Sequence, residues 1–361
     1  MSLTPMKALV FLDTNKVGLV DKPIPEPGPW DVVVRTTASS ICTSDMHTIA
    51  GGIAIPQGRT LGHESVGLVH RVGDKVTGFN EGDRVVVGAL TPCGHCDYCQ
   101  RGHSTQCGGA LGGFKWTTQR EGNLSEYFVV NDAAYNLTHI PDDVTDEQAL
   151  YATDVLGTGI AAAQLADIPV GGTVAIIAQG PVGLCATMGA RLLGAGLVVT
   201  TATRPERARL SERFGADVVL NPRRCNVVEE VRALVGPQGV DSAIEALGTH
   251  ETFEQCVRLI KPGGTVANAG YHGWESQAPL PIPIVSFGMG MNAKTIRGLL
   301  APGGREHLTR MLRLLQTGKV DPTPLTTHRF HFSEVERAFQ LMSDKGEKII
   351  KPVITYEEGD L

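Results

Sequence analysis

The sequence lacks any apolar run close to the roughly 20 residues that a membrane-spanning helix needs, so we expect no membrane partner. It also lacks an excess of positive charge. The net charge is −6 and the pI is about 6.0, which argues against nucleic acid or an anionic membrane as the main partner. The opening "MSLTPMKALVF" has one lysine and no long apolar core, so it does not read as a secretory signal, and we expect a cytoplasmic protein.

What is present is an ordinary globular composition, with 42% hydrophobic and 19% charged residues in a chain of 361. A chain of this length is too long for one hydrophobic core, so two domains are expected. Four of the eight cysteines fall between residues 93 and 107. A secreted disulfide scaffold spreads its cysteines through a small chain, whereas clustered thiols in a reducing compartment favour metal binding.

Two different patterns divide the chain. Up to about residue 154, β-branched or alternating runs bounded by Gly, Pro and Asp predict an irregular β domain, with strands at residues 6–11, 31–38, 65–73, 83–88 and 124–131. From about residue 173, short apolar strands alternate with helical segments, which predicts βαβ units and a parallel sheet with helices on both faces. We therefore predict an α/β fold in which a doubly wound Rossmann domain, residues 155–295, is inserted between residues 1–154 and 296–361 of the β-rich domain.

The segment "TPCGHCDYCQRGHSTQC" supplies Cys93, Cys96, Cys99 and Cys107. Four thiolates at this spacing close a tetrahedral shell around Zn²⁺ and leave no open position, which is typical of a structural site. Four free thiols in a surface loop are one alternative. An iron–sulfur cluster is another, but the bacterial ferredoxin spacing has three residues before the fourth cysteine and a proline after it. Here the gap is seven residues and Gly108 follows.

A second candidate set starts with Cys42 in "ICTSDMH", continues with His63 and Glu64 in "TLGHESVG", and ends with Asp154 in "YATDVLGTG". Thiolate, imidazole and carboxylate are all zinc ligands, and three of them with an open position form the pattern of a catalytic zinc. On spacing alone, a packing role for each side chain remains open.

The segments "CTSDMHT", "LGHESVG" and "TDVLGTG", with "GHESVGLVHRVGDKVTGFNEGDRV" and the cysteine cluster, resemble the medium-chain zinc-dependent alcohol dehydrogenases, especially the secondary-alcohol branch. The resemblance runs from about Met6 to Thr355 and implies a GroES-like catalytic domain. It also implies that Cys42, His63 and Asp154 bind a catalytic zinc. The best-known members carry a cysteine at the position of Asp154, and several secondary-alcohol relatives lack the four-cysteine cluster.

The same resemblance implies roles for residues around that zinc. Zinc lowers the pKa of bound water from about 16 to about 7, and a bound alcohol is expected to respond similarly. Ser44 is implied to contact the substrate oxygen and His47 to pass its proton outward, both residue types being suited to proton transfer. The alternative for Ser44 and His47 is that their side chains only form hydrogen bonds with backbone groups of a loop. Glu64 is implied to be an exchangeable ligand. The alternatives are a carboxylate that lies beside the zinc ligands without binding the metal, and a solvated surface charge.

A Gly-containing turn, "AIIAQGPVGL", ends one predicted strand and opens a helix. In the dinucleotide fingerprint G-x-G-x-x-G, Gly180 and Gly183 hold the second and third positions, with Pro181 and Val182 between them. Ala178 replaces the first glycine, which costs little if its φ stays negative. A helix N-terminus at this point attracts phosphate groups.

The next predicted strand ends in "TTATRPER". Enzymes that prefer NAD carry Asp or Glu there. Here Thr203 and Arg204 can instead donate hydrogen bonds to a 2′-phosphate, which favours NADP over NAD. Arg223 and Arg224 add positive charge, although NADP-dependent relatives carry a tyrosine where this chain has Pro222. A solvated Arg204 with no cofactor role is the alternative.

The remaining assignments depend on the resemblance alone. Phe114 is implied to line the substrate pocket. Leu300 is implied to stand where residues of a neighbouring subunit close this pocket. Tyr271 follows a predicted strand, where a cofactor contact and plain packing are both open. The predicted function is hydride transfer between a small-molecule alcohol and NADP, with reversible reduction of ketones or aldehydes, by a homotetramer or homodimer. The rivals are a zinc-free quinone-reductase-like enzyme and a non-catalytic scaffold protein.

Overall fold

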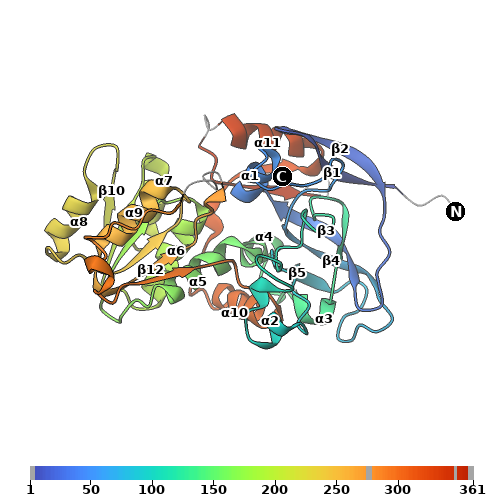
Figure 1. Cartoon of the computed structure of the whole chain (residues 1–361). Coiled ribbons are helices and arrows are strands. Elements are labelled where there is room, and N and C mark those ends of the chain that lie inside the picture. The colour runs from blue at the N-terminus through green and yellow to red at the C-terminus, as the bar shows by residue number, and fades with distance from the viewer. Residues whose placement is uncertain (1–4, 274–278, 345–347, 357–361) are drawn as a thin grey trace. The chain divides into compact units, whose positions relative to one another are not determined.

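The computed structural model describes residues 5–273, 279–344 and 348–356. The chain divides into two compact units (Figure 1). Unit 1 contains the residues up to Gly157 and from Ala301 onward, and unit 2 contains Thr158–Leu300. Within the described residues, no helix combines the length and the apolar character needed to cross a membrane.

Unit 1 is built mainly from antiparallel strands. Its seven-stranded sheet has the order β14-β15-β3-β4-β5-β7, with β6 also paired to β3, and β1 and β2 form a separate two-stranded sheet. The strands are β1 (Pro5–Asp13), β2 (Lys16–Pro23), β3 (Val32–Ser40), β4 (Glu64–Val72), β5 (Arg84–Val87), β6 (Tyr127–Val130), β7 (Leu137–His139), β14 (Thr326–His331) and β15 (Lys351–Thr355). The helices are α1 (Thr43–Ile49), α2 (Asp97–Gln100), α3 (Ala133–Asn136), α4 (Asp146–Leu150), α10 (Arg305–Gln316) and α11 (Val335–Asp344).

The pairing of strands in this sheet brings distant residues together. β3 and β4 run antiparallel with Ser40 opposite Glu64, and β15 runs antiparallel to β3 with Ser40 opposite Val353. The end of β3 therefore lies beside the start of β4 and the start of β15. The chain that leaves β3 enters α1 within three residues, so α1 begins at the same edge of the sheet.

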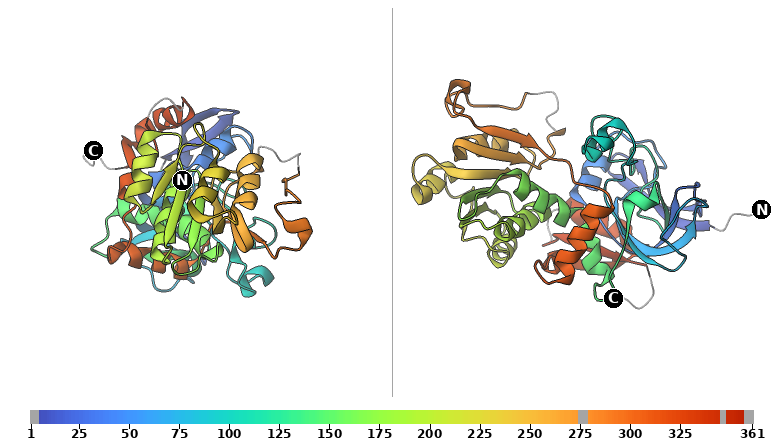
Figure 2. Two further views of the ribbon diagram at one scale, coloured as in Figure 1. Left: turned by 90° about the vertical axis from the view of Figure 1, so that its left-hand side faces the viewer. Right: turned by 90° about the horizontal axis from the view of Figure 1, so that it is seen from below.

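Unit 2 has the predicted parallel sheet, with the strand order β10-β9-β8-β11-β12-β13. All of its strand pairs are parallel, and the strands can be followed in Figures 1 and 2. The strands are β8 (Thr173–Ile177), β9 (Leu197–Thr201), β10 (Val218–Leu220), β11 (Val240–Glu245), β12 (Ile260–Asn268) and β13 (Thr295–Gly298). The helices are α6 (Pro181–Leu192), α7 (Pro205–Arg213), α8 (Val227–Val235) and α9 (His250–Leu259), while α5 (Val155–Leu165) begins in unit 1 and ends here.

Two hydrophobic cores lie on opposite faces of this sheet. Alternate residues of β8 separate them, with Ala175 and Ile177 in the core formed with α8 and α9, and Val174 and Ile176 in the core formed with α5 and α6. Helices on both faces and an order that places β8 beside both β9 and β11 define a doubly wound Rossmann fold, as predicted. The last strand, β13, carries unit 2 to Leu300, five residues beyond the sequence-based boundary at 295.

Candidate functional site

The first candidate site lies in unit 1 at the ends of two paired strands, where β3 ends and β4 begins. Cys42 is the N-cap residue of α1, His63 and Glu64 stand at the start of β4, and Asp154 directly precedes α5. One potential ligand atom from each of these four side chains lies within 4.8 Å of the other three. The structure thus brings together the predicted set, although its members lie up to 112 positions apart in the sequence.

The distances between these donors suit a tetrahedral zinc. Cys42 Sγ lies 3.7 Å from Asp154 Oδ2, and His63 Nε2 lies 3.6 Å from the same oxygen. Ligands about 2.0–2.3 Å from a central ion, at the tetrahedral angle, stand about 3.3–3.8 Å apart. His63 and Glu64 are each 1% exposed, so these two donors are already removed from water, while Cys42 and Asp154 are half-buried. The residues present therefore fit the zinc that the sequence implies.

Glu64 has a partner that the sequence did not reveal. Lys351 Nζ, on the first residue of β15, donates a hydrogen bond to Glu64 Oε1 at 2.6 Å and lies 2.6 Å from Oε2. Both side chains are buried, with 3% exposure for Lys351. Of the alternatives considered for Glu64, a solvated surface charge is therefore wrong. The carboxylate lies both within the donor group and in a buried ion pair.

Asp45 is a second residue that the sequence reasoning missed. Its Oδ1 lies 3.2 Å from Nδ1 of His63, the ring nitrogen that faces away from the donor group, and its Oδ2 accepts a hydrogen bond of 2.8 Å from the Cys42 N–H. A carboxylate at Nδ1 fixes ring orientation and makes Nε2 a better ligand. The capping-box spacing, in which Asp45 is the third residue of α1 after the N-cap Cys42, is the signal that points to it.

Burial and neighbouring charges set the protonation of this site. Burial raises the pKa of the Cys42 thiol and that of the Glu64 carboxyl, and the Lys351 charge opposes both effects. Burial alone would lower the pKa of His63, but the negative charge of Asp45 and the hydrogen bonds that the His63 ring donates to Asp154 and Asp45 hold it well above its usual value. Without a cation, the site therefore favours the protonated forms of Cys42, His63 and Glu64. A divalent ion would stabilise the deprotonated thiolate and carboxylates.

Of the residues predicted around the catalytic centre, Ser44 and Phe114 both contact His63. Ser44 Oγ is 3.1 Å from His63 Nε2, on the ligand side of the ring. His47 follows on α1 three residues later, so it lies one helical turn from Ser44. The ring of Phe114 meets the His63 ring edge to face, with centroids 5.3 Å apart. Leu300 is the last residue of unit 2 and follows β13.

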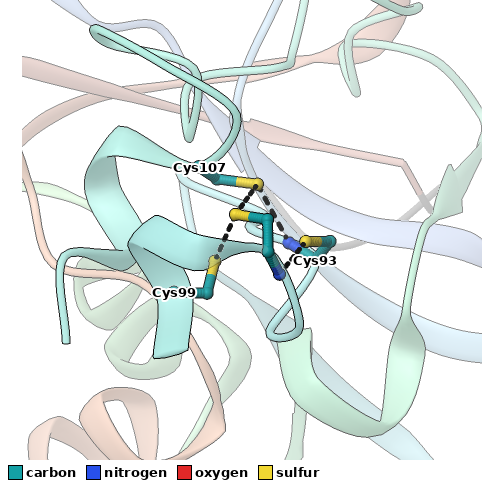
Figure 3. Close-up of side chains that lie close together, drawn as sticks. Cys93, Cys99 and Cys107 are labelled. Atoms are coloured by element: carbon teal, nitrogen blue, oxygen red, sulfur yellow. Dashed lines mark hydrogen bonds between the residues drawn. The ribbon is translucent and has the colours of Figure 1, made fainter. Parts of the chain in front are cut away.

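The four clustered cysteines form a second candidate metal site in unit 1 (Figure 3). One sulfur from each lies within 4.8 Å of the other three, with Cys96 Sγ 3.5 Å from Cys99 Sγ and 4.0 Å from Cys107 Sγ. Four sulfurs about 2.3 Å from one zinc stand about 3.8 Å apart. The backbone also prepares the site, because Cys96 N–H donates to Cys93 Sγ and Cys93 N–H to Cys107 Sγ, each at 3.3 Å.

The four thiols are not equivalent. Hydrogen bonds from the backbone of Cys99 and Gly108 lower the pKa of Cys96 to about 6, whereas burial and the neighbouring Cys96 raise that of Cys99 to about 12. Burial likewise raises the pKa of Cys107. One thiolate forms readily, and the others need a cation to compensate the added negative charge. All eight cysteines of the chain lie among the described residues, and none of them forms a disulfide bond.

The glycine turn in unit 2 leaves room for a ligand to approach its backbone closely. Gly180 is the N-cap of α6, and a Cβ placed on it would meet nothing within 4 Å, so space is open above the turn. A Cβ on Gly183 would lie 2.0 Å from the backbone oxygen of Ala178, so only glycine allows this packing of helix against strand. Pro181 and Val182 form the first turn of α6, whose N-terminus faces this space. These features fit a dinucleotide pyrophosphate.

One detail of the turn contradicts the sequence-based expectation. Ala178 has φ of 75°, in the left-handed region, rather than the negative φ that would make an alanine there inexpensive. The turn keeps the shape that the first fingerprint glycine normally permits, and Ala178 adopts it under strain. Its N–H donates a hydrogen bond of 2.9 Å to Oγ1 of Thr201, the last residue of β9, which ties the turn to the neighbouring strand.

The remaining predicted cofactor residues follow the carboxyl ends of β9 and β12, two strands of the same parallel sheet. Thr203 is exposed just past β9, and Arg204 is the N-cap of α7. Tyr271 follows β12 and is 37% exposed. In a doubly wound sheet, ligands bind outside these carboxyl ends.

Comparison with known proteins agrees with this geometry. The family described as "Alcohol dehydrogenase GroES-like domain" matches residues 28–142, and the family described as "Zinc-binding dehydrogenase" matches residues 181–317. The NADP-dependent isopropanol dehydrogenase of Thermoanaerobacter brockii is 42% identical, over 97% of this chain and 99% of that protein. An alcohol dehydrogenase of Cupriavidus necator is 40% identical, over 97% and 98% respectively.

Among solved structures, alcohol dehydrogenase TADH from Thermus sp. ATN1 superposes with a TM-score of 0.88. It is 30% identical, and the match covers 98% of this chain and 100% of that one. The two family matches lie one on either side of the residues where α5 leaves unit 1. The chain therefore belongs to the medium-chain zinc-dependent alcohol dehydrogenases, in the secondary-alcohol branch.

Proposed function

We propose that this chain is an NADP-dependent zinc enzyme that interconverts a small alcohol with its ketone or aldehyde. A hydride passes from the alcohol carbon to the nicotinamide of NADP, and the hydroxyl proton is released. The observation that carries the proposal is that metal-ligand atoms of Cys42, His63, Glu64 and Asp154 converge in one group beside Ser44. The names of the relatives favour a small secondary alcohol, since several are NADP-dependent isopropanol dehydrogenases.

When bound, the zinc supplies a Lewis acid that polarises the substrate oxygen. The chain's own residues do the rest. The Ser44 hydroxyl both donates and accepts hydrogen bonds, so it can take the proton from the alcohol, and His47, one turn further along α1, passes that proton on. Phe114, packed against His63, offers an apolar wall that keeps water from the reacting carbon.

The cofactor is assigned to unit 2. Gly180 and the N-terminus of α6 receive the pyrophosphate, Thr203 and Arg204 receive the 2′-phosphate, and Tyr271 contacts the cofactor. The second zinc, held by Cys93, Cys96, Cys99 and Cys107, has no open position and stabilises the surrounding loops.

The oligomeric state and location are part of the proposal. β13 is an edge strand of the unit 2 sheet, and the segment before it exposes apolar side chains, including Val285 at 75% and Met291 at 83%. An open sheet edge beside exposed apolar residues favours pairing with a second copy, as a homodimer or a pair of dimers. We place the protein in the cytoplasm because free, metal-binding thiols persist in a reducing compartment.

A substrate panel run in parallel with NADPH and NADH tests the proposal. Small ketones and aldehydes should oxidise NADPH faster than NADH, and chelation of zinc should stop the reaction. A zinc-free quinone-reductase-like enzyme would instead reduce quinones and keep its activity without metal. A non-catalytic scaffold would oxidise neither cofactor with any substrate of the panel.

A further inference from the structure

Arg207 is a basic residue of unit 2 that takes no part in the contacts proposed for zinc, substrate or cofactor. It is the third residue of α7 and lies one helical turn after Arg204, the N-cap of that helix. The helix starts just past the carboxyl end of β9, next to the strand that leads into the glycine turn. The two arginines therefore stand where the α7 N-terminus already favours negative charge.

The environment of Arg207 lacks the anion that such a group normally has. Its Nε is buried and has no hydrogen-bond partner among the residues that the structure describes. Burial and the charge of Arg204 both lower the pKa of its guanidinium, so the two cations lie close enough to repel each other. Partly burying a guanidinium whose Nε lacks a partner, beside a like charge, is unfavourable unless something compensates it. The arrangement suits an anion that arrives from outside the chain.

The position of Arg204 and Arg207 indicates which anion they can bind. The Ala178 N–H to Thr201 Oγ1 hydrogen bond joins the glycine turn to the end of β9, so a dinucleotide seated on the turn directs its adenosine ribose toward the residues after β9. Ala202, at the end of that strand, is 8% exposed and offers no carboxylate to repel a phosphate on the ribose. Arg223 and Arg224, beyond β10, are exposed and free to point into water, unlike the buried Nε of Arg207.

We propose that Arg207 is a second arginine ligand of the ribose 2′-phosphate and forms a two-arginine clamp with Arg204. The clamp rests on the proposed NADP dependence and names the residue that enforces it. A dianionic phosphate neutralises both guanidinium groups at once, and each can donate charge-assisted hydrogen bonds to its oxygens. NAD, which has a hydroxyl at this place, would leave the two cations unneutralised.

Titration calorimetry on the zinc-loaded full chain tests this directly, with 2′,5′-ADP as the probe and 5′-AMP as its counterpart without the 2′-phosphate. Arg207→Met should weaken binding of 2′,5′-ADP about tenfold or more, because it removes charge-assisted hydrogen bonds, and leave binding of 5′-AMP unchanged. Arg209→Met is the matched control. It removes the same charge from the same helix at an exposed position about 200° around the helix axis from Arg207. It should change neither affinity by more than about twofold.

The thermal midpoint of the ligand-free protein is the second readout. Removing a partly buried guanidinium whose Nε has no partner should leave the thermal midpoint unchanged or raise it, whereas a structural role for Arg207 would lower it. The clamp is refuted if Arg207→Met binds 2′,5′-ADP as tightly as the unaltered chain, or loses 2′,5′-ADP and 5′-AMP affinity equally. Failure of the NADP assignment itself looks different, because the unaltered chain would then bind 2′,5′-ADP no more tightly than 5′-AMP.

Discussion

Lys351 Nζ lies 2.6 Å from both carboxylate oxygens of Glu64, and the two side chains form a buried ion pair at the edge of the candidate zinc site. The pair joins the first residue of β15 to the first residue of β4, which lie 287 positions apart in the sequence. It also holds one carboxylate of the donor group in place. The stability of unit 1 and the geometry of the site therefore depend on the same contact.

Replacing Lys351 by Met should lower the free energy of unfolding by about 3–5 kcal/mol, because it leaves the Glu64 carboxylate buried without its partner. Urea denaturation of the zinc-loaded protein measures this. Lys348→Met, at an exposed position in the same segment, should change the free energy of unfolding by less than about 0.5 kcal/mol. Adding Glu64→Gln to Lys351→Met should recover part of the loss. Equal stability of Lys351→Met and the unaltered chain would mean that the pair does not hold the site.

The two fingerprint glycines should respond differently to alanine. Gly180→Ala should leave the thermal midpoint nearly unchanged, since its Cβ meets nothing within 4 Å and its φ of −75° suits any residue. It should nevertheless weaken NADP binding by about tenfold or more, because the methyl group occupies the space the pyrophosphate approaches. Calorimetric titration with NADP and a thermal melt separate the two effects.

Gly183→Ala is the counterpart of that change. Its Cβ would lie 2.0 Å from the Ala178 backbone oxygen, so strand and helix must move apart, and we expect a loss of about 1–3 kcal/mol in the free energy of unfolding. If Gly183→Ala were as stable as the unaltered chain, or Gly180→Ala bound NADP equally well, the turn would not have the role described.

Stability should fall on acidification through one identifiable histidine. Burial, with Arg310 nearby, lowers the pKa of His307 to about 4 from a usual value of 6.5. Because the folded-state pKa is depressed, the contribution of His307 is complete above pH 6.5 and is lost as the pH falls toward 4, where the unfolded chain binds the proton first. At about 1.4 kcal/mol per pKa unit, the loss reaches at most about 3.5 kcal/mol.

His307→Gln removes that titration. Denaturant midpoints measured from pH 7.5 to 4.5 should show a shallower decline for His307→Gln than for the unaltered chain, with the two profiles differing in slope only below about pH 6.5. Parallel profiles across the whole range would contradict the assignment, because other acid-labile groups, including the metal sites, contribute equally to both proteins.

The sequence was informative where local pattern decides structure. The alternation of apolar strands and helices predicted the parallel sheet of unit 2. The spacing of the four clustered cysteines predicted a shared metal site, and the structure places their sulfurs within 4.8 Å of one another. The fingerprint also predicted the close packing at Gly183. The convergence of Cys42, His63, Glu64 and Asp154 was predicted from the family resemblance and not from their spacing. Their relative positions are set by strand pairing across unit 1.

What the sequence did not reveal depends on long-range contacts and on backbone conformation. Lys351 reaches Glu64 only because β15 pairs with β3, which no local pattern encodes. β13 was not recognised as a strand of unit 2, because it is four residues long and is fixed by pairing with β12. The positive φ of Ala178 is imposed by the turn around it, against the preference of the residue itself.

The central claim is that Cys42, His63 and Asp154 hold one zinc with an open position, separate from the zinc of the cysteine cluster. Metal analysis with turnover measurements on the unaltered chain, Cys42→Ala and Cys107→Ala tests it most directly. We predict about two zinc ions per chain for the unaltered protein and about one for each variant. Cys42→Ala should lose alcohol oxidation while still binding NADP. A Cys42→Ala protein that kept two zinc ions and full turnover would contradict the account.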